Sequence, residues 1–307
     1  MTARGNPILV TGAHRSGTTW LGRLLATHEA LGYVHEPFNA RVPGVYPAAP
    51  EHFVHINADN GAQWDSRIND IVHCRYPLAR HASSLPARRE ARIATEQWRA
   101  MRQQRGKRLL VKDPLAIFAA EYLHQRHNFS VIATVRNPCG FVSSVLRLNW
   151  RIPSPARHLL AQPGLAEFVA PFADQLNRVA ARDISHIDEA ILIWRVFNTW
   201  IAQAAERNPQ WVVVRTEDIA ADPLVGVSAL LAGLDLAVTQ DVLAGIRPLT
   251  EGPAGDSFLY NDVFRDSSAV THAWRTRLEP DQIERIAEGT ADVAQRWYSL
   301  AALEMSD

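Results

Sequence analysis

The sequence predicts an α/β fold in which helices cover both faces of a central, mainly parallel sheet of about five strands. Short runs of β-branched and apolar residues alternate along the chain with segments whose apolar residues recur at helical spacing. Gly12, Pro114 and Asn137 mark three of the boundaries between strand and helix. Such alternation is typical of parallel strands, because these need a crossover connection that is usually a helix.

The strands can be placed in order along the chain. The first is followed at once by Gly12 and then by leucines at helical spacing. The strongest strand, 129–135, precedes Asn137 and Pro138, and proline suits the first turn of a helix. The expected strands are 8–11, 31–35, 108–111, 129–135 and 211–215. The expected helices cover residues 18–28, 115–125 and 138–150, and a longer helix ends near residue 205.

Two segments interrupt the alternation, residues 40–104 and 152–183. The first begins rich in proline and ends in a charged amphipathic helix expected over residues 86–104. Ligands of open α/β sheets bind beyond the carboxyl ends of the strands, so we expect these insertions to form walls of a substrate site. Residues 251–271 are rich in Gly, Asp and Ser, which suits either a lid or a passive surface loop. We expect one domain over residues 1–307, because no repeat or long linker divides the chain.

The composition excludes several classes of protein. The chain has 307 residues, 47% of them hydrophobic, which is ample for a sizeable core. Lys and Arg number 32, as do Asp and Glu, so no net charge favours nucleic acid or an anionic membrane. The two cysteines, Cys74 and Cys139, form no disulfide framework and favour a reducing compartment. With neither a signal peptide nor a membrane-spanning stretch in view, we expect a cytoplasmic protein without stable membrane insertion.

The segment between the first strand and its helix, Gly12–Thr19, is rich in groups that bind anions. Backbone N–H groups of a glycine-flanked loop and the positive end of the helix dipole favour a phosphate there. Gly12 and Gly17 permit the turn, three hydroxyls add donors, and Arg15 adds a permanent fork of donors. The alternative is an ordinary turn in which a threonine caps the helix, but the coincidence of these features favours phosphate binding.

This loop differs from that of nucleotide triphosphatases and kinases, which reads G-x-x-x-x-G-K-[ST]. The two glycines have that spacing, but Thr18 stands where the lysine should be, and the cation lies earlier, at Arg15. Neither Asp113 nor Asp218 is placed as a clear magnesium ligand at the end of an apolar strand. We therefore expect a P-loop-like fold that binds phosphate without a metal ion.

Arg136 and Ser144 are candidates for a second phosphate anchor. Arg136 follows the strand 129–135, and Ser144 lies two turns into the next helix, so the two side chains can converge on one phosphate. Taken singly, the arginine could pair with a carboxylate and the serine could be a packing residue. The two residues indicate a phosphate site only in combination with the loop Gly12–Thr19.

Together these segments resemble the donor site of the sulfotransferases that use 3′-phosphoadenosine 5′-phosphosulfate (PAPS). In that family a (K/R)-x-G-(T/S)-(T/S) loop cradles the 5′-phosphosulfate, and residues 15–19, RSGTT, match it. An R-(N/D)-P-x-D-x-x-x-S segment holds the 3′-phosphate, and residues 136–144 match it except that Gly140 replaces the usual acid. The resemblance implies that the arginine and the serine of this segment are phosphate ligands. It also implies PAPS as donor and 3′-phosphoadenosine 5′-phosphate (PAP) as product.

Weaker resemblances extend along most of the chain. Residues 109–114, LLVKDP, resemble the family's strand that ends in a lysine before a proline. Residues 215–223 resemble its YEDL-x-x-DP stretch, with Thr216 in place of a tyrosine that often lies against the adenosine. Residues 273–278 resemble its late W-(K/R) segment. The residues expected to close over the 3′-phosphate are Ser267, Ser268, Arg275 and Arg277.

The resemblance implies in-line transfer of a sulfuryl group from PAPS to an acceptor hydroxyl. By analogy with phosphoryl transfer, positioning and charge stabilisation dominate such a reaction. We expect Arg15 and the loop N–H groups to stabilise the leaving phosphate, and Ser16 to contact the bridging region. The other loop residues expected to bind the donor are His14, Gly17, Thr18 and Thr19.

Glu36 is the expected general base. It follows the strand 31–35, and residues 34–38, VHEPF, resemble the Glu-Pro stretch of carbohydrate and bacterial sulfotransferases, in which that glutamate is the base. Partial burial would raise the pKa of Glu36 toward the working pH. The alternative is that Glu36 pairs with an arginine and only closes a turn. His14 and His35 are rival bases, although strand alternation predicts that His35 points away from Glu36.

The expected acceptor is a small molecule, glycan or lipid with a hydroxyl, and a sugar or another aliphatic hydroxyl is preferred. The residues expected to face it are His35, Phe38, Lys112 and Asp113, with Tyr46, Trp64 and Trp150 as further aromatic contacts. Lys112 has the alternative of being merely solvated. The rival functions are a magnesium-dependent kinase or nucleotidase and a non-catalytic nucleotide-binding module. The sequence leaves the oligomeric state open.

Overall fold

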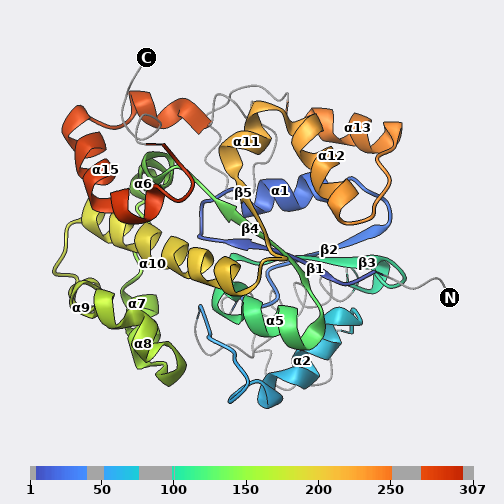
Figure 1. Cartoon of the computed structure of the whole chain (residues 1–307), viewed down its shortest axis with the longest axis horizontal. Helices are drawn as coiled ribbons and strands as arrows, with labels where there is room; N and C mark the ends of the chain where they lie inside the picture. Colours follow the sequence, from blue (N-terminus) through green and yellow to red (C-terminus); the bar gives the residue numbers. More distant parts are fainter. Residues whose placement is uncertain (1–4, 40–51, 76–98, 100, 251–270, 300–307) are drawn as a thin grey trace, which may run out of the picture.

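A computed structural model describes residues 5–39, 52–75, 99, 101–250 and 271–299 of the chain (Figure 1). Its centre is a five-stranded parallel sheet of order β2-β3-β1-β4-β5. The strands are β1 (Ile8–Gly12), β2 (Leu31–His35), β3 (Arg108–Lys112), β4 (Ser130–Val135) and β5 (Val212–Arg215). The predicted α/β class with a parallel sheet is confirmed, and each strand boundary lies within one residue of its predicted place.

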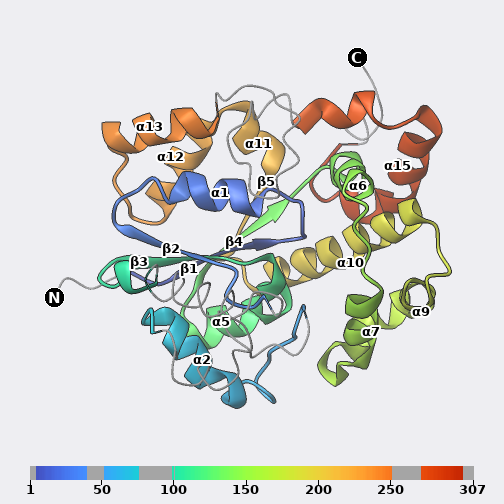
Figure 2. The same cartoon turned by 180° about the vertical axis from the view of Figure 1, so that it is seen from behind.

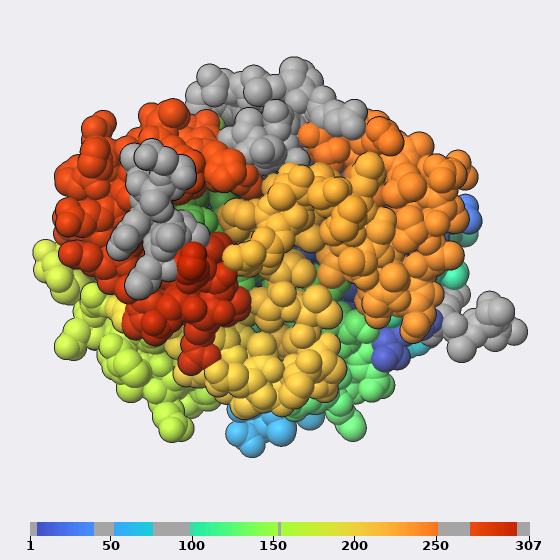
Figure 3. All heavy atoms as spheres, turned by 45° about the horizontal axis from the view of Figure 1, so that its top comes forward, coloured from blue at the N-terminus to red at the C-terminus, as the bar shows by residue number. Residues whose placement is uncertain are grey.

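Helices cover both faces of the sheet, as the opposite views of Figures 1 and 2 show. One face carries α1 (Thr18–Leu25), α11 (Thr216–Ala221), α12 (Pro223–Gly233) and α13 (Gln240–Ile246). The other carries α2 (Ala62–Val72), α5 (Ala120–His127), α6 (Pro138–Arg147), α10 (His186–Arg207) and α15 (Pro280–Ala294). In Figure 3 the last described residues (red) and the helices α12 and α13 (orange) lie on opposite sides of the molecule.

Alternate residues of the central strands enter two separate cores, as the two-residue period of a strand requires. In β1, Ile8 and Val10 pack on the α1 face, whereas Leu9 packs on the α10 face. In β4, Ile132 lies on the α1 face and Val131 on the α10 face. Both faces are therefore apolar, which leaves the carboxyl edge of the sheet as the place for polar groups.

The insertion 152–183 is helical. It contains α7 (Pro153–Ala161), α8 (Ala166–Val169) and α9 (Ala173–Ala181). The buried carboxylate of Glu189 in α10 accepts a hydrogen bond from the N–H of Ile152 (2.6 Å) and forms an ion pair with Arg151, so it fastens this insertion to the long helix. The remaining short turns are 3₁₀ helices: η1 (Pro114–Ala119), η2 (Pro163–Leu165), η3 (Ala170–Phe172), η4 (Arg247–Leu249) and η5 (Ala273–Thr276).

Three predicted helices differ in their limits. The helix expected over 115–125 begins as the 3₁₀ turn η1 and continues as α5, and the one expected over 138–150 ends at Arg147. The helix expected over 18–28 ends at Leu25. Most of the amphipathic helix predicted over 86–104 and residues 251–270 lie outside the described residues. Within the described part of the chain, no helix combines the length and apolar character needed to cross a bilayer.

Candidate functional site

The predicted site residues follow the carboxyl ends of parallel strands in one sheet. The loop after β1 carries Arg15, Glu36 follows β2, and Arg136 follows β4. Because the strands are parallel, these residues share one edge of the sheet, as expected for a ligand site of this fold.

The loop between β1 and α1 turns through left-handed backbone conformations. Gly17 has φ 82°, and a Cβ at this position would lie 2.7 Å from Cγ2 of Thr216, so only glycine fits. Arg15 has φ 67°, an uncommon conformation for a residue with a side chain. Such strain persists where the surroundings fix it, and it is typical of functional loops.

Two side chains hold this loop from within. The hydroxyl of Ser16 is buried; it hydrogen-bonds to the carbonyl of Ala13 and lies 2.9 Å from Oγ1 of Thr134. The hydroxyl of Thr216 donates to the carbonyl of Ser16 (2.6 Å) and lies 3.1 Å from that of Val135. The structure therefore places Ser16 and Thr216 as braces of the loop, and their predicted contacts with the donor stay predictions.

The second predicted anchor lies directly against the loop. Arg15 donates from Nε to Oγ of Ser144 (3.1 Å), and Arg136 donates from Nη1 to the carbonyl of Arg15 (2.9 Å). Asn137 caps α6 by accepting from the N–H groups of residues 139 and 140 at 2.9 and 3.3 Å. The three predicted anion ligands are thus brought together, although 129 residues separate Arg15 from Ser144.

Arg136 has unused donor capacity. Its Nε is buried without a hydrogen-bond partner. Burial lowers the pKa of its guanidinium to about 10, partly offset by Glu217 and reinforced by Arg15. A Cβ on Gly140, the residue in place of the family's acid, would lie 3.1 Å from this Nε. A buried cation with a free donor fits an anionic ligand, whose charge would offset the cost of burying the guanidinium.

The carboxylate of Glu217 supports this anchor from the side of β5. It accepts from the N–H of Asn137 (3.0 Å) and from the hydroxyl of Tyr298 (2.9 Å). The indole of Trp194 donates to the carbonyl of Arg136 (2.8 Å). Sequence reasoning missed the roles of Glu217, Tyr298 and Trp194, since each acts across more than 50 residues; Glu217 does lie in the stretch 215–223 that resembles a family motif.

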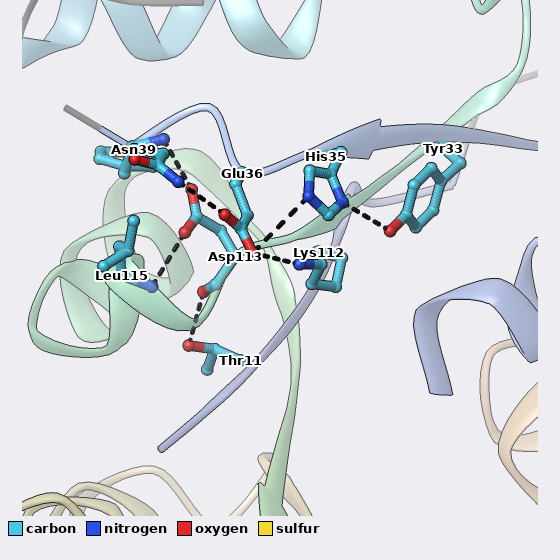
Figure 4. A network of polar contacts seen from close by, with 9 residues as sticks. Thr11, Tyr33, His35, Glu36, Asn39, Lys112, Asp113 and Leu115 are labelled. Carbon is cyan, nitrogen blue, oxygen red and sulfur yellow. Dashed lines mark hydrogen bonds and ion pairs between the residues drawn. The ribbon is translucent and has the colours of Figure 1, made fainter. Parts of the chain in front are cut away.

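Glu36 lies at the centre of a polar cluster (Figure 4). Its Oε1 pairs with the ammonium of Lys112, and its Oε2 accepts from the side-chain amide of Asn39 (2.7 Å). Its backbone N–H donates to the carbonyl of Lys112 (2.8 Å), which fixes the residue to the end of β3. The ion-pair partner of Glu36 is therefore this lysine and not the arginine of the alternative prediction.

The predicted opposite orientation of His35 and Glu36 is wrong. Nε2 of His35 lies 3.7 Å from Oε1 of Glu36, and Nδ1 of His35 lies 3.1 Å from the hydroxyl of Tyr33. The alternation fails because Glu36 has φ 46° and has left the extended strand. The positive φ turns its side chain toward the one before it.

The expectation of a raised pKa for Glu36 is also wrong. Burial raises the pKa of this carboxyl, but the charge of Lys112 and the hydrogen bonds from Lys112 and Asn39 outweigh it, so the pKa lies below its usual value. Burial lowers the pKa of Lys112 although Glu36 opposes the shift. Glu36 is therefore ionised at neutral pH, the state that a base requires.

The alternative expectation for Lys112, that its side chain is merely solvated, is wrong. Its side chain is fully buried beneath α1. A Cβ on Gly22 of α1 would lie 3.0 Å from Cγ of Lys112 and 3.1 Å from Cε2 of Tyr33. The absence of a side chain at Gly22 makes room for the lysine, and direct contact with a donor or acceptor stays a prediction.

Asp113 is committed to the backbone. Its carboxylate accepts from the N–H groups of Phe38 (2.6 Å) and Leu115 (2.9 Å), and its carbonyl accepts from the hydroxyl of Thr11 (2.9 Å). Burial, reinforced by Glu36, raises the pKa of Asp113 to about 7. Phe38 is buried as well, so these two predicted acceptor contacts lie beneath the surface.

His14 faces an aromatic wall. Its ring centroid lies 5.1 Å from that of Phe53 and 5.0 Å from that of Trp150. Burial lowers the pKa of His14 to about 3, with Glu36 opposing and Lys112 and Arg15 among the groups that reinforce the shift. His14 is therefore neutral, and its buried Nδ1 has no hydrogen-bond partner.

The other predicted contacts are less central or lie outside the described residues. Arg275 and Arg277 are exposed, and the guanidinium of Arg275 lies 5.6 Å from the ring centroid of Trp274. Trp64 is buried within α2. Ser267, Ser268 and Tyr46 lie outside the described residues. Among the residues that the structure describes, no group of three or more His, Cys, Asp or Glu side chains could hold a metal ion, and a metal-free reaction stays a prediction.

Comparison with known proteins identifies the family of the chain. Residues 7–241 match the model of the sulfotransferase family. Carbohydrate sulfotransferase 5 from Mus musculus is 32% identical over 96 residues, which are 29% of this chain and 24% of that protein. A sulfotransferase domain from the curacin biosynthetic pathway shares 14% identity at TM-score 0.49, covering 94% of this chain and 99% of its own. A sulfotransferase from Alicyclobacillus acidocaldarius shares 16% identity at TM-score 0.47, covering 100% of this chain and 98% of its own. The family match spans more than half of the chain, which therefore belongs to the sulfotransferase family of enzymes.

Proposed function

We propose that the enzyme transfers a sulfuryl group from PAPS to an aliphatic hydroxyl, with Glu36 as the general base. The observation that carries this proposal is the convergence of Arg15, Arg136 and Ser144 on one edge of the sheet, beside the N-terminus of α1. Two neighbouring guanidinium groups, one bonded to the hydroxyl of Ser144 and the other to the backbone of the loop, suit a ligand with two phosphate groups.

Each half of PAPS has its own partners in this proposal. The N–H groups at the start of α1 and the hydroxyls of Thr18 and Thr19 bind the 5′-phosphosulfate. Arg136 and Ser144 bind the 3′-phosphate, for which the free Nε of Arg136 is a further donor. Arg15 contacts Ser144 and stabilises the charge that develops on the leaving phosphate. PAPS supplies the sulfuryl group, and the mouse sulfotransferase SULT7A1 has been solved with PAP.

Glu36 performs the proton transfer. Its ionised carboxylate removes the hydroxyl proton of the acceptor as the oxygen attacks sulfur. Lys112 keeps the carboxylate ionised despite its burial, and Asn39 fixes the rotamer by binding the second oxygen. Glu36 thus begins each cycle in the reactive state.

A sugar or another aliphatic hydroxyl is the proposed acceptor class. The partly exposed rings of His14 and Trp150 offer aromatic faces to a sugar ring or an alkyl chain, and the buried ring of Phe53 packs behind His14. The curated relative named above is a carbohydrate sulfotransferase. The insertions as acceptor walls, a single domain and a cytoplasmic location stay predictions.

The test is transfer of radiolabelled sulfate from PAPS to a panel of hydroxyl probes: octyl β-D-glucoside, chitobiose, dodecanol and para-nitrophenol. We expect labelled product from the sugar or aliphatic probes without added magnesium. Transfer to para-nitrophenol alone would overturn the acceptor class. Magnesium-dependent ATP hydrolysis without sulfate transfer would overturn the reaction itself.

Replacing Arg15 should remove the transition-state stabilisation. We expect Arg15→Ala to lower kcat by about 10²–10³-fold, the usual effect of losing one such donor. The matched control is Arg296→Ala, because this exposed arginine pairs with Glu206 away from the loop. Equal turnover of Arg15→Ala and the control would contradict the role of Arg15.

A further inference from the structure

The proton taken from the acceptor must also leave the site. The proposed reaction breaks the acceptor O–H bond, forms an O–S bond and breaks the bond between sulfur and the bridging phosphate oxygen. The proton passes to Glu36, which is only 4% exposed and so cannot hand it directly to bulk water. A neighbouring group is needed that accepts a proton and reaches solvent.

Most of the described groups around the Glu36 carboxylate cannot do this. Lys112 already carries its proton, and its side chain is fully buried. The amide nitrogen of Asn39 donates to Glu36 and has no basic lone pair. Asp113 is fully buried, and its two carboxylate oxygens accept backbone N–H groups. None of these three offers a path to water.

His35 meets both requirements. Its Nε2 lies 3.7 Å from Oε1 of Glu36, and its side chain is 37% exposed against 6% for that of Glu36. Its Nδ1 lies 3.1 Å from the hydroxyl of Tyr33 (Figure 4). We propose that His35 accepts the proton from Glu36 and releases it to solvent. This inference rests on the proposed role of Glu36 as the base.

One tautomer of His35 can both accept the proton and release it. With Nδ1–H donating to the oxygen of Tyr33, the lone pair of Nε2 faces Glu36. Transfer from the Glu36 carboxyl to Nε2 gives an imidazolium, which then loses the Nε2 proton to water and returns to the starting tautomer. Tyr33 is itself held by Arg23 of α1, whose guanidinium lies 4.6 Å from the ring centroid.

The charges around His35 favour release over retention. Burial, the ammonium of Lys112 and the guanidinium of Arg23 lower the pKa of His35 to about 4, although Glu36 opposes the shift. An imidazolium in this setting gives up its proton at neutral pH. His35 is therefore neutral before each cycle and ready to accept.

The test follows product and proton separately in a single turnover with PAPS and octyl β-D-glucoside. Rapid quench measures sulfated product, and a pH-indicator dye in weak buffer measures the released proton. In the wild type we expect both to appear together. In His35→Asn and His35→Gln we expect proton release to lag behind product formation, at a rate lower by about tenfold or more. Added imidazole should remove the lag.

The controls separate this relay from the proposed function. His124→Gln should show no lag, because His124 lies on α5 and bonds to the carbonyl of Phe129, at the other end of the sheet. Proton release without a lag in the folded His35 variants would overturn the relay, as would an equal slowing of product and proton. Full turnover in Glu36→Gln would instead overturn the proposed base, whatever the His35 variants do.

Discussion

The donor anchors and the cluster around Glu36 lie at the same edge of the sheet, but different contacts hold them. Around the donor loop, Thr216 and Arg136 donate to backbone carbonyls, and Nε of Arg136 remains as a cationic donor for a ligand. Around Glu36, side chains bond to one another, and the main charge is paired with Lys112. The donor half is thus built to receive charge from outside, whereas the Glu36 half balances its charge within itself.

Neutralising the proposed base is the most direct test of whether the two halves act separately. We expect Glu36→Gln to lower kcat by about 10²–10⁴-fold, the usual contribution of a positioned base. The affinity for PAP should stay the same, because the donor half does not bond to this carboxylate. Turnover by sulfate transfer and PAP binding by calorimetry measure the two effects. A comparable loss of PAP affinity would show that the halves are not separate.

The converse change is Arg136→Ala. Loss of a charged hydrogen-bond partner costs about 1.5–3 kcal/mol, so we expect PAP to bind roughly tenfold to a hundredfold more weakly. Calorimetry with PAP gives this value directly, and Arg296→Ala is again the control. Unchanged affinity would contradict the second anchor.

The internal charge balance of the Glu36 half can be tested by pH. In Lys112→Met, the effect of burial on Glu36 is no longer opposed by the ammonium, so the pKa of this carboxyl rises. Glu36 must be ionised to act, so activity is lost as pH falls through its pKa. The acid limb of the kcat profile should therefore move to higher pH. An acid limb at the wild-type pH would show that Lys112 does not set the ionisation of Glu36.

The smallest expected effect concerns the brace of the donor loop. Thr216→Val keeps the shape against Gly17 but removes the hydroxyl that donates to Ser16. We expect the free energy of unfolding to fall by about 1 kcal/mol, the typical net value of such a bond. Denaturant titration measures it, and Thr216→Ser, which retains the hydroxyl, should recover most of the loss. Wild-type stability of Thr216→Val would contradict the stabilising role of the hydroxyl.

The two halves also differ in how far the sequence predicts them. The donor half follows from local signals: β-branched strands, Gly17 in a tight turn, and Arg136 and Ser144 at fixed spacing on one strand and helix. Their partners meet because adjacent parallel strands bring their carboxyl ends together. The inward turn of Thr216 could not be predicted, because it depends on the carbonyls of two distant segments.

The contacts around Glu36 could not be predicted for a similar reason. The glutamate was found by its position after a strand, but its neighbours depend on one backbone angle. The positive φ of Glu36 brings His35 to the same side, and the buried Lys112 comes from a strand 76 residues away. Periodicity rules assume regular backbone, and they fail at such a departure.

The two halves are not fully independent, because helix α1 contacts both of them, and this matters for engineering. The first turn of this helix lies beside the proposed donor site. Gly22, one turn later, packs against Lys112, which pairs with the proposed base Glu36. A residue with a side chain at Gly22 would push either Lys112 or the whole helix, and the donor site would move with it. Libraries that seek a new acceptor are therefore best confined to residues around Phe53 and Trp150, with α1 left unchanged.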